Sequence, residues 1–127
     1  MSNLRILYDH EREFNAEERA WLGKLLSIDF EDKDILERQV AYAKVVGGCG
    51  CGCKTVDVRV DGEAPRAKWT VGVPVEMQSK ASDGMTLLFL LHMADGYINE
   101  LEVLRMDSEP ITEAIDITDA EVSTNTC

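Results

Sequence analysis

The chain has 127 residues with 24 acidic and 13 basic side chains, which gives a formal net charge of −11. A chain of this length forms one domain of ordinary size, which buries about two thirds of its unfolded surface without a disulfide or a metal. The negative charge repels nucleic acid and anionic membrane surfaces, and it favours encounters with basic proteins.

The N-terminal stretch from Met1 to Tyr8 is too short and too polar to be predicted as a signal peptide. The longest apolar run, Leu87 to Leu91, is far shorter than a membrane span. We therefore predict a soluble, cytoplasmic protein that binds neither nucleic acid nor membrane.

The first half of the chain predicts two helices. Asn15 is followed three residues later by Glu18, which is the pattern of a helix N-terminus, and apolar residues then recur at helical spacing up to residue 26. Aspartates in segment 29–34 favour a second helix start through the helix dipole. An apolar stripe follows, and Gly47 and Gly48 are predicted to end this helix.

The second half predicts strands, because apolar and polar residues alternate between Gly- and Asp-containing turns. Pro74 cannot donate a hydrogen bond to a neighbouring strand, so we expect a sheet edge or a bulge there. The predicted strands are Thr55 to Val60, Trp69 to Met77, Met85 to Met93 and Tyr97 to Met106. The expected fold is α+β, with two N-terminal helices packed on a four-stranded antiparallel meander.

The C-terminal part of the chain is strongly acidic. Residues 107–127 contain six carboxylates and no lysine or arginine. We expect a single α+β domain over residues 1–117 and an acidic flexible tail over residues 118–127.

Segment 47–55 is rich in glycine and cysteine, which alternate from Gly48 to Cys53. A phosphate-binding loop needs a second glycine where Cys53 stands and a helix after it, so we exclude that motif. Thiolates of Cys49, Cys51 and Cys53 are candidate ligands for a soft metal such as zinc, but their spacing is tighter than in zinc knuckles and a fourth ligand is required. We favour a structural role, in which the glycines permit close backbone approach and the cysteines act as small apolar residues.

Little in the sequence indicates catalysis. It contains no nucleophile-elbow motif and no zinc-protease helix motif, and its histidines, His10 and His92, fall in a charged stretch and an apolar strand. Glu100 and Glu102 share one face of a predicted strand, but no nucleophile or substrate-binding pattern accompanies them. We predict a protein that is not an enzyme and that needs no cofactor.

The last predicted hairpin indicates an interaction surface. With a two-residue turn at Asp95–Gly96, pairs can be counted outward along the two strands. One face then carries Leu87, Phe89, Leu91, Met93, Ile98, Glu100, Glu102 and Leu104. Among these, Phe89, Leu91, Glu100 and Glu102 are the candidate partner-binding residues. Two helices cover only one side of a small sheet, so an apolar patch beside carboxylates would remain exposed and would mark an interface. The alternative is that chain ends or loops cover this patch.

Several segments occur in a distinctive order: the helix segment 15–26, the Gly- and Cys-rich segment before Thr55-Val-Asp-Val58, Val73-Pro-Val-Glu76, Asp83-Gly84, Leu90-Leu-His92, and Asp95 to Val103. In this combination the chain resembles a group of small, uncharacterised bacterial proteins over roughly residues 13–111. Members of such groups are often proposed to be immunity proteins, each of which neutralises a toxin encoded beside it. The resemblance carries no established catalytic residues.

These observations predict a non-enzymatic acidic binding protein, specifically a bacterial immunity protein that binds and neutralises a basic toxin domain. Two alternatives remain. One is a cysteine-based metal-binding or metal-sensing protein, and the other is a structural homodimer that self-associates through its sheet face.

Overall fold

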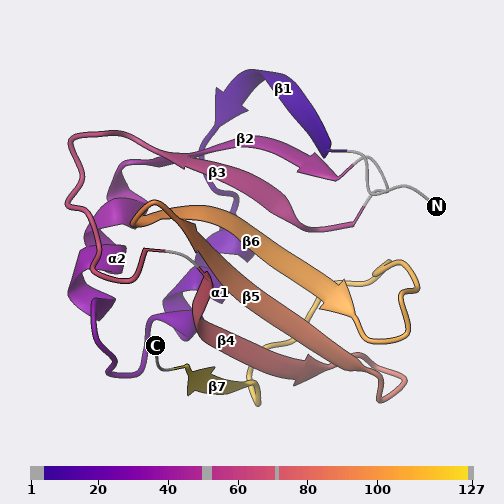
Figure 1. Cartoon of the computed structure of the whole chain (residues 1–127). Coiled ribbons are helices and arrows are strands. Elements are labelled where there is room, and N and C mark those ends of the chain that lie inside the picture. The colour runs from indigo at the N-terminus through magenta and orange to yellow at the C-terminus, as the bar shows by residue number, and fades with distance from the viewer. Residues whose placement is uncertain (1–4, 50–52, 71, 126–127) are drawn as a thin grey trace.

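The computed structural model describes residues 5–49, 53–70 and 72–125. They form one seven-stranded antiparallel sheet and two short helices (Figure 1). In chain order the elements are β1 (Arg5–Arg12), α1 (Ala16–Leu25), α2 (Lys33–Ala41), β2 (Ala43–Cys49), β3 (Val56–Val60), β4 (Gly72–Lys80), β5 (Thr86–Ala94), β6 (Tyr97–Arg105) and β7 (Glu121–Thr124). The strand order across the sheet is β1-β2-β3-β6-β5-β4-β7.

The predicted fold of two helices on a four-stranded meander is therefore wrong. The four expected strands exist as β3, β4, β5 and β6, but β1, β2 and β7 widen the sheet, and most of the regular structure is strand. The strands also do not follow one another as a meander, because β3 pairs with β6 and the connection 61–71 separates β3 from β4. Neither helix in the described ranges has the length or apolar character needed to cross a bilayer.

β2 occupies the place where the second helix was expected to end. Its two successive valines are β-branched and favour a strand. Gly47 allows β1 to come close, because a Cβ there would lie 2.5 Å from the backbone oxygen of Ile6. A Cβ on Gly48 would lie 2.7 Å from the hydroxyl of Tyr8. The two glycines that we interpreted as a helix stop instead make room for a neighbouring strand.

The two edge strands carry no clear alternation in the sequence. β1 pairs with β2 over Arg5–Leu7 and again at Arg12, and residues 8–11 arch away between these points. β7 pairs along β4 at the other edge. Residues 118–127 were expected to form a flexible tail, but residues 121–124 belong to the sheet and Val122 packs against the core.

Helix α1 begins as its sequence predicts. The side chain of Asn15 accepts a hydrogen bond from the backbone N–H of Glu18, and the carboxylate of Glu18 accepts one from the backbone N–H of Asn15. Glu18 is buried, and Arg12 at the end of β1 donates to both of its carboxylate oxygens, at 2.8 and 2.9 Å. The hydrogen bonds that Arg12 donates to Glu18 also raise the pKa of Arg12. This bidentate pair neutralises a buried charge and ties β1 to the helix.

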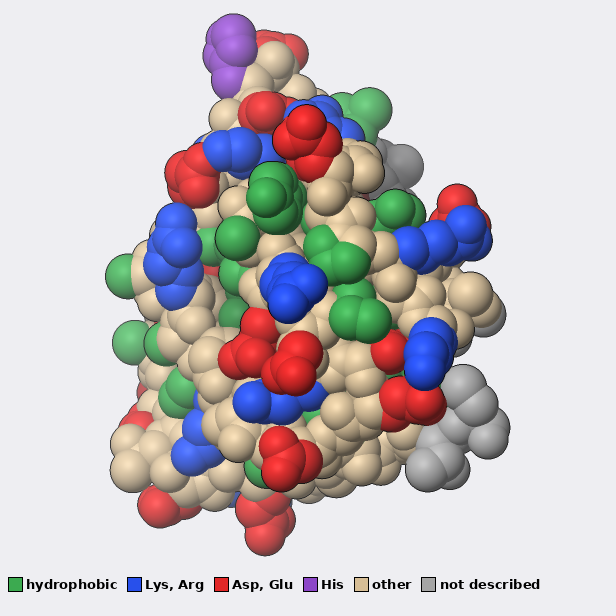
Figure 2. Space-filling view, turned by 90° about the vertical axis from the view of Figure 1, so that its left-hand side faces the viewer, with side chains coloured by type: hydrophobic (Ala, Val, Ile, Leu, Met, Phe, Trp, Pro, Cys, Tyr) green, Lys and Arg blue, Asp and Glu red, His purple; other side chains and the backbone are tan. Residues whose placement is uncertain are grey.

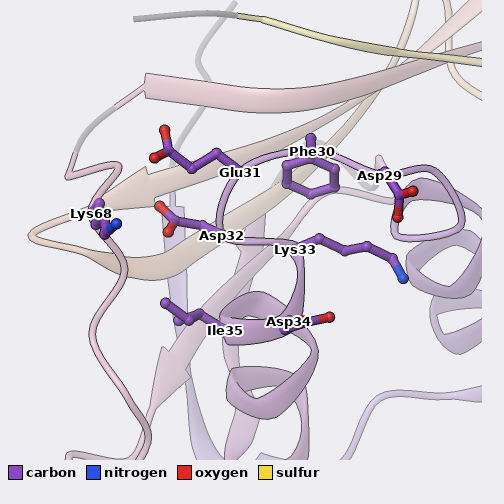
Figure 3. A pocket seen from close by; sticks show the side chains of 8 residues that line it. All are labelled: Asp29, Phe30, Glu31, Asp32, Lys33, Asp34, Ile35 and Lys68. Carbon is purple, nitrogen blue, oxygen red and sulfur yellow. The ribbon is translucent and has the colours of Figure 1, made fainter.

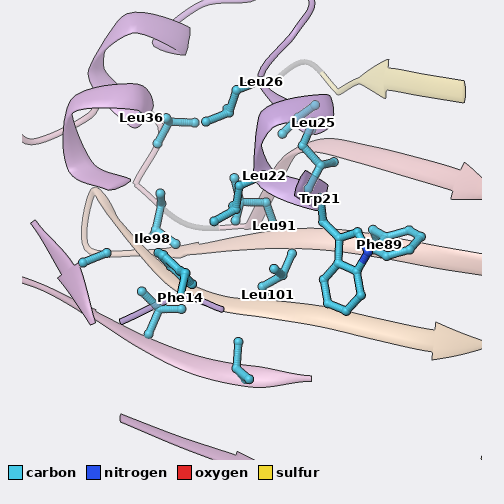
Figure 4. Close-up of a cluster of buried hydrophobic side chains, with 14 of the residues drawn as sticks. Phe14, Trp21, Leu22, Leu25, Leu26, Leu36, Phe89, Leu91, Ile98 and Leu101 are labelled. Carbon is cyan, nitrogen blue, oxygen red and sulfur yellow. The ribbon is translucent and has the colours of Figure 1, made fainter. Parts of the chain in front are cut away.

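The hydrophobic core lies between the helices and one face of the sheet (Figure 4). Trp21 of α1 packs on Phe89 of β5 with ring centroids 5.3 Å apart. Residues of β5 alternate between half-buried and buried along its whole length, and those of β6 do so from Glu100 to Leu104, which is the pattern of a sheet covered on one side. The opposite side of the sheet has no helix over it among the described elements (Figure 1).

A buried glutamine of α2 holds the turn between β5 and β6. The amide nitrogen of Gln39 donates to the carbonyls of Gly96 and Pro65, each at 2.9 Å, and its amide oxygen accepts from the backbone N–H of Ile98 at 2.9 Å. The residue is fully buried. Buried backbone groups need hydrogen-bond partners, and this one side chain supplies them to the backbone of the turn and of the loop around Pro65.

We expect Gln39→Met to lower the free energy of unfolding by about 2–4 kcal/mol, because it keeps the volume but leaves the N–H of Ile98 without its partner. Urea unfolding followed by circular dichroism measures this change. The control is Arg38→Met, which alters the exposed neighbouring residue on the same helix and should cost less than about 0.5 kcal/mol. Equal effects of the two substitutions would contradict the anchoring role of Gln39.

Candidate functional site

The register of the β5–β6 hairpin decides which side chains share a face. Ala94 pairs with Tyr97 and Met93 pairs with Ile98, as counting from a two-residue turn predicts. The next pair is His92 with Glu100, so Asn99 is an extra residue on β6 and forms a β-bulge. Beyond the bulge, every pair is shifted by one residue from the counted register, which moves each side chain of β6 to the opposite face.

The four residues predicted to form a contact surface therefore separate onto two faces. Phe89 and Leu91 are fully buried beneath the helices, beside Leu101. Glu100 and Glu102 lie on the other side of the sheet, where they are half-buried. The predicted combination of these four residues in one surface is wrong, but the two glutamates do lie on the uncovered face.

We call this uncovered side the open face. Its residues follow from the strand register as three rows across the sheet. They are Leu104, Leu88, Gln78 and Glu121 in the first row, Glu102, Leu90, Glu76 and Ser123 in the second, and Leu7, Gly47, Asp57, Glu100 and His92 in the third. Beyond these rows the same register places Lys80 with Thr86 at one margin of this side and Arg59 with Lys44 at the other.

The open face combines an apolar centre with negative charge around it. Leu88 and Leu104 face each other across β5 and β6, and Leu90 lies beside them, all half-buried by their neighbours. Carboxylates occupy each row, and they belong to Asp57, Glu76, Glu100, Glu102 and Glu121. Such a surface can contact apolar side chains of a partner while its carboxylates attract lysine or arginine around them.

Hydrogen bonds position several of these acidic side chains. The Nε2 atom of His92 lies 2.8 Å from a carboxylate oxygen of Glu102, and both side chains are about one third exposed. The amide of Asn125 donates to Glu76 at 3.1 Å. At the margin of the face beyond the third row, Arg59 of β3 forms an ion pair with Glu11, which lies in segment 8–11 of β1. These contacts restrict the side chains without removing them from the surface.

The groups with shifted pKa values lie elsewhere. Arg105 at the end of β6 donates to Asp83 and Asp107, and the hydrogen bond from Arg105 lowers the pKa of Asp83. The pKa of Asp116 is lowered by hydrogen bonds from Thr118. Both sites lie in turns and loops, where they fix chain connections.

A surface depression lies beside the loop between the two helices. It is shallow and is lined by residues 29–35 and Lys68 (Figure 3). The carboxylate of Asp32 is already used, because it accepts a hydrogen bond from the backbone N–H of Trp69 at 2.9 Å. Lys33 pairs with Glu37 along α2. We attribute these acidic residues to loop and helix-start geometry.

The flank near the β5–β6 turn has a mixed surface. Figure 2 shows Lys and Arg side chains among Asp and Glu there, with hydrophobic side chains in small groups between them. This flank offers no single charge to a partner.

The structure describes only part of the proposed set of metal ligands. Cys53 is a half-buried free thiol, the backbone of Cys49 pairs with Arg5, and Cys51 lies outside the described residues. Within the ranges that the structure describes, no three His, Cys, Asp or Glu side chains are arranged to hold a metal ion.

The sequence pattern did not reveal several residues of the open face. Leu7 belongs to an edge strand without alternation, and Glu121 belongs to the segment expected to be a tail. Glu76 alternates with buried neighbours along β4, so its outward direction was predictable from the pattern. The position of Leu90 beside Glu102 required the bulge at Asn99, which no sequence motif marks.

Phe89→Ala is expected to lower the free energy of unfolding by about 3–5 kcal/mol, because it leaves a cavity under Trp21. Leu88→Ala changes the adjacent residue on the open face and should cost about 1 kcal/mol, since that side chain is already partly in solvent. Chemical denaturation of both variants tests the assignment of faces. A larger loss for Leu88→Ala than for Phe89→Ala would contradict it.

Comparison with protein-family models, with curated proteins and with solved structures finds no significant match to this chain. The resemblance to small bacterial proteins proposed as immunity proteins therefore remains a hypothesis.

Proposed function

We propose that this protein binds a basic protein partner through the open face, and that it acts as an immunity protein that neutralises a toxin in the cytoplasm. One observation supports this most strongly. The side of the sheet opposite the helices presents half-buried leucines, and carboxylates stand around them in every row.

The arrangement of residues suits docking of a folded surface. Leu88, Leu90 and Leu104 come from adjacent strands and form a small apolar area that a partner can cover. The carboxylates Glu100 and Glu102 lie next to it on β6. A partner with lysine or arginine beside apolar side chains matches this face, because its cations meet carboxylates as its apolar atoms leave water.

The net charge of the whole chain also favours a basic partner. A net charge of −11 steers a basic protein toward any part of this molecule, and the open face adds apolar contact once the two meet. Neutralisation then needs only occlusion, since a bound immunity protein keeps the toxin surface from its target. No catalytic group is required for that role.

The test uses the protein encoded beside this gene as the candidate toxin. Co-expression of this chain is expected to restore the growth of cells that produce the candidate toxin. The two purified proteins are expected to bind with an affinity that falls as the salt concentration rises. The double variant Glu100→Gln/Glu102→Gln should weaken binding by about tenfold to hundredfold, because it removes two charges beside the apolar centre. Isothermal titration calorimetry measures the dissociation constants.

The matched control removes two charges elsewhere. Glu37→Gln/Glu63→Gln alters exposed residues of α2 and of the connection between β3 and β4, so it removes the same amount of negative charge and leaves the open face intact. Equal weakening by both double variants would mean that only total charge matters. Binding that is insensitive to salt and to both glutamate substitutions would remove the electrostatic part of the proposal.

A further inference from the structure

We propose that β1 pairs with β1 of a second copy of this chain, in antiparallel orientation and with a two-fold axis at Leu7. This contact uses the edge of the sheet, where Leu7 is the residue of the open face nearest to it. β1 lies at one end of the strand order, with no described strand on its outer side. Its apolar side chains are unusually exposed, at 51% for Ile6, 78% for Leu7 and 39% for Tyr8.

The two edges of the sheet differ in how they are protected. β7 spans only four residues, and Glu121, which begins it, is charged. β1 spans eight residues and presents three consecutive apolar residues. Its residues 8–11 also have no register partner on β2. Proteins usually shorten, charge or cover an edge strand to prevent pairing, so a long apolar edge indicates a strand that pairs.

The sequence of β1 is self-complementary about Leu7. In antiparallel pairing centred there, Leu7 lies opposite Leu7 of the second copy, Ile6 lies opposite Tyr8, and Arg5 lies opposite Asp9. The centre of the contact is thus apolar, and opposite charges meet at both of its ends. A register centred between Tyr8 and Asp9 would instead oppose Arg5 to Arg12, which like-charge repulsion disfavours.

Local charge favours a second copy over the basic partner at this edge. β1 carries two arginines and two carboxylates with a neutral histidine, so its formal charge is zero in a chain of charge −11. Two strongly acidic molecules repel each other least where each is locally neutral. A basic partner gains nothing from charge at β1 and is attracted instead to the open face.

The pairing would join two sheets into one continuous sheet. Residues opposite each other in an antiparallel pair point to the same side, and Leu7 belongs to the open face. The two open faces of the dimer therefore lie on the same side, with the paired Leu7 residues between them. A dimer of this form presents two partner-binding faces next to each other.

Light scattering coupled to size-exclusion chromatography tests the contact, across a dilution series in moderate salt. Wild-type protein is expected to show twice the mass of the chain at high concentration and to dissociate on dilution. Leu7→Lys should raise the dimer dissociation constant by about tenfold or more, because it places two cations opposite each other. Met106→Lys makes the same change at another exposed apolar residue and should leave the dimer intact.

A charge exchange tests the register itself. Asp9→Arg should weaken the dimer, because it opposes two arginines, and Arg5→Asp/Asp9→Arg should restore it with the charges reversed. Circular dichroism of each variant confirms that the fold is kept. A monomer at every concentration would overturn the proposal, as would a dimer that Leu7→Lys leaves unchanged or one that the double exchange fails to restore. None of these outcomes depends on toxin binding.

Discussion

The hydrogen bonds of Gln39 are the constraint on which the rest of this structure depends. The side chain reaches from α2 into the β5–β6 turn, where it binds Gly96 and the N–H of Ile98. These contacts fix the first pairs of the hairpin, and the bulge at Asn99 follows immediately. A shift of one residue turns every side chain of a strand to the other face. The register set within these few residues therefore decides which side chains of β6 belong to the open face.

The local pattern of the sequence predicted the elements that carry strong periodicity. The capped start of α1 at Asn15 was correct, and so were the strands that became β3 to β6. The irregularity expected at Pro74 is also present, since the register of β4 against β5 shifts between Gly72 and Val75. These features depend on neighbouring residues alone, and such features can be inferred without knowledge of the fold.

The errors came from contacts between distant segments. Gly47 and Gly48 stop a helix in many chains, but here they allow β1 to approach, and only the packed structure reveals that neighbour. Strand β7 forms because β4 offers it a free edge, not because its own sequence alternates. The bulge at Asn99 separated Phe89 from Glu102, so the charged half of the candidate site was predictable and its apolar half was not.

Nuclear Overhauser contacts across the β5–β6 hairpin test the account most directly, because the open face exists only in the bulged register. The bulged register predicts backbone contacts between Leu91 and Leu101 and between Phe89 and Val103. Contacts between Leu91 and Glu100 and between Phe89 and Glu102 would mean that the hairpin has no bulge. The glutamates would then lie on the helix side of the sheet, and the proposed docking surface would lose the charges on which it depends.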